Sequence, residues 1–185
     1  MYSVELMVKE HENILKMLDV MKKACCHILD GGEIVDDDFR KMIAFVRNYA
    51  DKHHHGKEEH ILFHEMSLHL GQIGATLIQH GMLVEHDLGR LHIKDLETAL
   101  DQYKKEPKTL YKLGILAEAA GYVNLLERHI DKENKVVYTY AEKNLTQDLL
   151  QSIDKRVEDF EARAEKEGIQ NIYLQYLQEL TQKYA

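Results

Sequence analysis

Apolar residues recur every three or four positions along four successive stretches of the chain. The first stretch covers roughly residues 3–30, the second 37–70, the third 75–105, and the fourth runs from Pro107 to about Asn144. This spacing places the apolar side chains on one face of an α-helix. The pattern therefore predicts four long helices.

The connections between these stretches are short and contain strong turn signals. Gly31 and Gly32 follow the first stretch, and Gly71 and Gly74 separate the second from the third. Short connections make consecutive helices antiparallel neighbours. We therefore expect an all-α protein built as an up-down-up-down four-helix bundle.

The C-terminal part of the chain differs from the rest. Gly168 separates two expected helices, 147–166 and 171–184, and this part contains no histidine. We expect residues 1–145 to form the bundle. Residues 146–185 are expected to form a C-terminal helical extension that covers the bundle or faces a partner.

Composition narrows the class of protein. The chain has 185 residues, of which 44% are hydrophobic and 30% charged, with a formal net charge of −8. A nucleic-acid-binding protein needs a basic stripe, and the sequence has none. No apolar run approaches the ~18 residues of a membrane span. We therefore expect a protein that binds neither nucleic acid nor membrane. The N-terminal segment lacks the basic start and small-residue cleavage site of a secretory signal, so we expect a cytoplasmic location.

Two segments of the chain repeat one motif. Residues 54–63 and 129–138 both read His-x-x-Lys-Glu, followed after two residues by two aliphatic residues and an aromatic one. The copies fall on the second and fourth predicted helices. In each copy the histidine and the glutamate are four residues apart, so they lie on one helix face. An imidazole and a carboxylate placed in this way can bind one metal centre together.

The three consecutive histidines 53–55 are separated by their helical phase. His54 shares the inward face with Ala50 and Glu58, whereas its two neighbours are each rotated by about 100°. This predicts that His54 faces the interior. It also predicts a solvated or interfacial position for four other histidines, which are His53, His55, His60 and His64.

One histidine from each predicted helix falls at a common height in the bundle. His11 and His54 lie at nearly equal distances from the first turn, and His86 and His129 at nearly equal distances from the connection before Pro107. A lone histidine on an apolar face is usually an ordinary core residue. Four at one level, two of them with a glutamate one turn further, indicate a metal site.

The candidate metal ligands are four histidines and two glutamates: His11, His54, Glu58, His86, His129 and Glu133. This set is too large for one tetrahedral zinc ion. Two carboxylates that bridge two metals, with nitrogen ligands at the ends, suit a di-iron or di-manganese centre. Without metal the bundle would bury six polar groups at one level, so metal should contribute to folding stability.

With these residues the chain resembles the hemerythrin-like, or HHE cation-binding, domain proteins. The resemblance rests on Glu10-His11-Glu12, "HHGKEEHILF" (54–63), "VEHDLGR" (84–90) and "RHIDKENKVVY" (128–138), and covers about residues 5–140. It implies a non-haem centre of two iron ions joined by an oxo or hydroxo bridge. The four histidines would be terminal ligands, and Glu58 and Glu133 the bridging carboxylates.

One position departs from the family pattern. Oxygen-carrying hemerythrins place a second histidine one turn before the third-helix ligand, and Met82 occupies that place here. A thioether does not replace imidazole on hard iron. One iron would then have an open or water-filled position, which argues against a role in oxygen transport.

The sequence favours a di-iron protein that binds or senses a small oxidant such as O₂, NO or peroxide. It favours metal and diatomic-ligand binding over enzymatic turnover. An enzyme or iron donor in oxidative or nitrosative stress, with peroxidase-like activity or a role in iron-centre repair, is the alternative. A structural bundle with adventitious metal is a third possibility.

Ferritin-like chemistry uses Glu-x-x-His motifs, and none of the twelve histidines has a glutamate three residues before it. The sequence therefore does not indicate a ferritin-like site. The oligomeric state stays open.

Overall fold

The computed structural model describes the backbone of residues 1–185 and all side chains except that of Ile169. The regular elements of this described part are helical. They form six consecutive helical rods, some of which combine α-helical and π-helical (η) segments. The rods are α1 (Tyr2–Leu29); α2 (Asp36–Phe45), η1 (Val46–His55), η2 (Glu58–Leu62) and α3 (Phe63–His69); α4 (Gly71–Leu77), η3 (Ile78–Met82) and α5 (Leu83–Lys105); α6 (Thr109–Lys132), η4 (Glu133–Val137) and α7 (Tyr138–Asn144); α8 (Gln147–Glu167); and α9 (Ile169–Lys183).

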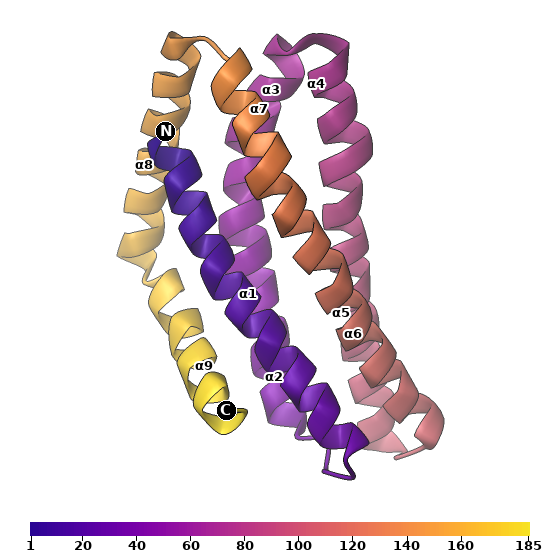
Figure 1. Cartoon of the computed structure of the whole chain (residues 1–185). Coiled ribbons are helices and arrows are strands. Elements are labelled where there is room, and N and C mark those ends of the chain that lie inside the picture. Colours follow the sequence, from indigo (N-terminus) through magenta and orange to yellow (C-terminus); the bar gives the residue numbers. More distant parts are fainter.

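The first four rods run alongside one another, and α8 and α9 lie along the side of α1 (Figure 1). The all-α class is confirmed, and the rods begin and end within a few residues of the predicted helices. The prediction of a four-helix bundle is too simple, because the last two rods supply part of the core. Ile153 and Val157 of α8 and Leu180 of α9 are buried. The division into domains at residue 145 stays a prediction.

The apolar core consists of two clusters. In α1, Ile14 belongs to the larger cluster and Met7 to the smaller one. In the second rod, Ala50 belongs to the larger cluster and Ile61 to the smaller one. The other two long rods divide in the same way. The residues between the two clusters form one polar layer across the molecule, at the level where the sequence placed its histidines.

Four π-helical segments lie in or next to this layer. They are η1, η2, η3 and η4, and they include His54, Glu58 and Glu133. A π-helix has more residues per turn than an α-helix, and single π-helical turns are frequent at functional sites. These segments were not predicted. None of the described helices combines the length and apolar character that a membrane crossing requires.

Candidate metal centre

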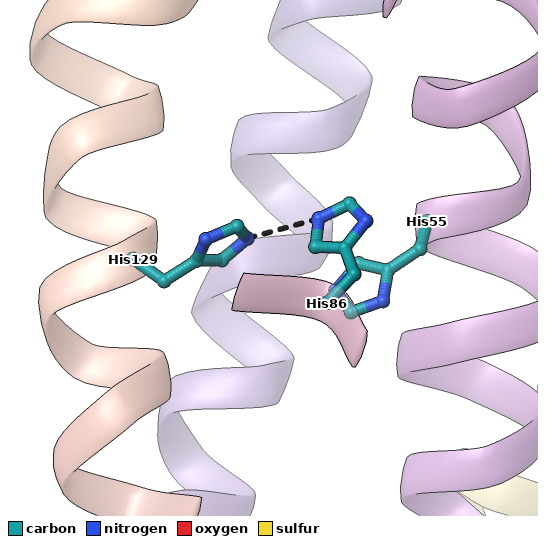
Figure 2. Close-up of side chains that lie close together, drawn as sticks. All are labelled: His55, His86 and His129. Atoms are coloured by element: carbon teal, nitrogen blue, oxygen red, sulfur yellow. Dashed lines mark hydrogen bonds between the residues drawn. The ribbon is translucent and has the colours of Figure 1, made fainter. Parts of the chain in front are cut away.

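The six predicted ligand residues lie together in the polar layer, each at most 1% exposed. Their histidines form two pairs. The Nε2 atoms of His11 and His54 are 2.8 Å apart. Those of His86 and His129 are 3.1 Å apart. Figure 2 shows this second pair, with a dashed line between the two nitrogens. If the layer holds two cations, one would lie beside His11 and His54 and the other beside His86 and His129. We refer to these two candidate places as the first and the second metal position.

Two carboxylates connect the histidine pairs. Glu58 Oε2 lies 3.7 Å from His54 Nε2 and 3.6 Å from His86 Nε2. Glu133 Oε2 lies 3.2 Å from His11 Nε2, and its Oε1 lies 3.1 Å from His129 Nε2. Each carboxylate thus contacts both pairs. This arrangement suits two cations that share bridging carboxylates.

Hydrogen bonds fix the far side of each imidazole. In all four histidines Nδ1 faces an oxygen acceptor outside the layer, so the Nδ1–H donates and Nε2 points toward the carboxylates. The acceptors are Asn134 Oδ1 for His11 (2.8 Å), Glu10 Oε2 for His54 (2.8 Å), Glu59 Oε1 for His86 (2.7 Å) and Glu85 Oε2 for His129 (2.9 Å).

Lysines of the repeated motif hold two of these outer carboxylates. Lys57 pairs with Glu10, and Lys132 pairs with Glu85. Lys57 is fully buried and also lies 2.5 Å from Glu161 of α8. The repeat therefore encodes an imidazole and a carboxylate of the layer and a cation for the outer carboxylate, and α8 contributes to the surroundings of the layer.

Three of the four oxygens of the inner acids lack hydrogen-bond partners among the described residues. Glu58 Oε2 and both carboxylate oxygens of Glu133 are buried without one. Burial and the charge of Glu133 raise the pKa of Glu58 well above its usual value. Burial also acts to raise the pKa of Glu133, but His129 and His11 outweigh it and hold that pKa well below its usual value. Unpaired buried carboxylates are costly, and bound cations would remove that cost, so the donor set fits a metal centre.

The imidazoles have divergent proton affinities. Burial and the neighbouring His11 lower the pKa of His54 to about 4. Burial would lower the pKa of His129 as well, but Glu133 and Glu85 outweigh it and raise that pKa to about 10. The pKa of His11 is also raised, because Glu133 outweighs the effect of burial. A cation in the layer would therefore compete with protons on some of these side chains.

Two predictions about the neighbouring histidines are wrong. His53 is 3% exposed and His55 is 6% exposed, although both were expected at solvent or an interface. The prediction of exposure assumed an α-helix with one buried face. These residues instead lie in the π-helical η1, and the second rod is covered on several sides. His53 contacts Glu161 of α8, and His55 stacks on His86 of α5. His60 and His64 are exposed, as predicted.

Tyr138 is a residue of the centre that the sequence did not identify. Its hydroxyl donates to Glu58 Oε1 at 2.5 Å, and its ring stacks on His11. Burial and the charge of Glu58 raise the pKa of Tyr138 well above its usual value, so the phenol stays protonated. The signal was present in the sequence, because Tyr138 is the aromatic residue that ends the second copy of the repeat.

A cavity of about 270 Å³ adjoins the second metal position. It contacts His55 and His86, and its inner lining includes Gly89, Ile93 and Tyr122. The Tyr122 hydroxyl is buried and has no hydrogen-bond partner among the described residues. The cavity therefore provides space for a small molecule beside the centre.

The fold and this layer of histidines and acids define a helical metal-binding protein. The sequence model of the Hemerythrin HHE cation binding domain matches residues 2–141. Because the match covers most of the chain, this protein belongs to the hemerythrin HHE cation-binding family, as the motifs indicated. Neither a curated protein nor a solved structure matches the chain.

Proposed function

We propose that this protein holds two iron ions in the polar layer and uses them to bind or sense a small oxidant, namely O₂, NO or peroxide. One observation carries the proposal. Two facing imidazole pairs flank two buried carboxylates, and three carboxylate oxygens have no hydrogen-bond partner among the described residues. Bound cations would offset the cost of burying these oxygens.

In this proposal each residue has a defined role. His11 and His54 hold the cation at the first position, and His86 and His129 hold the cation at the second. Glu58 and Glu133 bridge them. Bound iron would supply the electrons and the Lewis acidity that activate small oxidants. The family match supports a metal, and this donor set suits iron or manganese, of which we propose iron.

The other groups of the chain control access and geometry. Tyr138 fixes Glu58 through its hydrogen bond, and the apolar clusters on both sides of the layer exclude water. The cavity beside His86 is large enough for a diatomic molecule or a peroxide. We infer that the physiological ligand reaches the second metal position from this side.

The test is metal analysis of protein purified without oxygen, combined with optical spectra before and after addition of O₂ and of NO. We expect about two iron ions per chain and spectral changes on addition of either gas. The proposal fails if the purified protein contains only adventitious metal, or if bound iron responds to neither gas.

Release of iron to other proteins is a second candidate. A surface groove lies on the His129 side, and its lining includes Glu85, Glu127 and Asp131. Glu85 also accepts the hydrogen bond from His129, so this groove reaches the surroundings of the second metal position. Transfer of iron to an added chelator within seconds would favour this role, whereas slow transfer together with reversible ligand spectra would favour sensing.

A further inference from the structure

A fifth buried imidazole lies beside the second metal position. His55 comes from the second rod and approaches His86 and His129, as Figure 2 shows. Its ring is nearly parallel to that of His86, with centroids 3.8 Å apart and an interplanar angle of 8°. One nitrogen of each of these three histidines lies within 4.8 Å of the other two.

His55 differs from the four predicted ligand histidines in its hydrogen bonding. Its Nδ1 is buried and has no hydrogen-bond partner among the described residues. The carboxylate of Asp51 is 3.4 Å away, but its Oδ1 already accepts two hydrogen bonds from Arg90. An imidazole that is 6% exposed and lacks a partner is unfavourable unless something else binds it.

The third rod contributes one imidazole to the centre. The residue one turn before His86 is Met82, which packs in the smaller apolar cluster. The second metal position therefore receives nitrogen from His86 and His129 alone, unless the second rod adds another. His55 is the remaining buried imidazole adjacent to both.

We propose that His55 is a fifth imidazole of the centre and coordinates the cation held by His86 and His129. This inference rests on the proposed two-cation centre. The cavity beside the ring, which contacts His55, Gly89, Ile93 and Tyr122, gives the imidazole room to turn from its stacked position and direct a nitrogen at the cation. A ligand that arrives through the cavity meets His55 first and competes with it for the cation.

The experiment compares three variants of the full chain as purified with metal: His55→Ala, His55→Phe and, as a matched control, His60→Ala on the exposed face of the same rod. His55→Phe keeps a ring that stacks on His86 but offers no nitrogen. Circular dichroism verifies that each variant folds. The readouts are metal per chain, the rate of metal loss to a chelator, and the absorption spectrum of the cobalt-substituted protein.

If His55 is a ligand, both His55 variants lose one of the two cations about tenfold faster than wild type, with an altered cobalt spectrum, while His60→Ala matches wild type. Imidazole added to the buffer then slows the loss of metal from the His55→Ala variant. The inference is overturned if His55→Phe retains both cations as wild type does, which would leave His55 a purely stacking role. A further variant, His86→Ala, tests the proposed centre itself. It must lose metal whether or not His55 is a ligand, so a His86→Ala protein that retains both cations would refute the centre.

Discussion

At the scale of single residues, the direction of each proposed ligand histidine is set by the hydrogen bond on its far nitrogen. His54 illustrates this, because Glu10 accepts from its Nδ1 and so directs Nε2 into the layer. Burial would raise the pKa of Glu10, but hydrogen bonds from His53 and His54 and the charge of Lys57 outweigh it and hold that pKa well below its usual value. Glu10 is therefore an anion at neutral pH, and in the proposed centre it would strengthen His54 as a metal ligand.

Replacement of this outer carboxylate tests its role. We expect Glu10→Gln to weaken metal binding about 10–100-fold, because a neutral amide supports the imidazole less well than a carboxylate. Competition with a chelator of known affinity measures the change. Glu12→Gln, two residues away and exposed, is the matched control and should bind metal as wild type does. Equal affinity in both variants would show that Glu10 does not assist His54.

At the scale of helices, α8 and α9 belong to the same packed structure as the other rods. Leu180 of α9 packs in the larger cluster with residues of α1 and α2. In α8, Asp154 accepts hydrogen bonds from the backbone N–H and the hydroxyl of Ser3. These bonds join α8 to the start of α1. The extension therefore stabilises the layer from outside, besides contributing Glu161 next to Lys57.

This packing predicts a clear difference between two leucines. Leu180→Ala should lower the free energy of unfolding by roughly 2–5 kcal/mol, because the side chain is fully buried. Leu113→Ala, at a side chain that is 60% exposed, should change it by less than about 0.5 kcal/mol. Denaturant unfolding of the metal-loaded protein measures both. Similar small effects would mean that α9 attaches only loosely.

The sequence predicted the features of these elements that depend on local pattern. The helix ends follow from apolar periodicity and from turns such as Gly31-Gly32, and the common level of His11 and His54 follows from counting residues away from a turn. The burial of His53 and His55 could not be predicted in this way. It depends on the π-helical geometry of η1 and on contacts with α8 and α5, and both arise only from tertiary packing.

At the scale of the whole molecule, two apolar clusters enclose one layer of buried acids and imidazoles. Removal of metal should therefore destabilise the entire fold, since Glu58 and Glu133 would lose their cations. We expect the thermal midpoint to fall by roughly 10 °C if free metal is at about 1,000 times its Kd. Differential scanning calorimetry before and after chelation measures it, and an unchanged midpoint would contradict a metal inside the core.

Proton competition gives the centre a pH dependence of defined sign. Without metal the pKa of His129 is about 10, so this imidazole carries a proton at neutral pH. The pKa values of His11 and Glu58 are also raised, so both side chains release their protons at a higher pH than usual. A cation must displace these protons, and metal affinity therefore falls as the pH falls. Because the cation displaces one proton from His129, metal affinity falls about tenfold for each pH unit below pH 10. His54, with a pKa of about 4, adds to this competition only in stronger acid.

Chelator competition across the neutral range measures this slope. We expect a steep loss of affinity toward lower pH, and release of protons when metal is added to weakly buffered metal-free protein. Metal binding with neither proton release nor pH dependence would show that the cation does not bind these side chains.

The most direct measurement is anomalous X-ray diffraction at the iron edge from crystals of the protein purified without oxygen. Two iron peaks should appear inside the molecule, one beside the Nε2 atoms of His11 and His54 and the other beside those of His86 and His129, with Glu58 and Glu133 between them. A single peak, or peaks only at surface side chains, would contradict the paired centre.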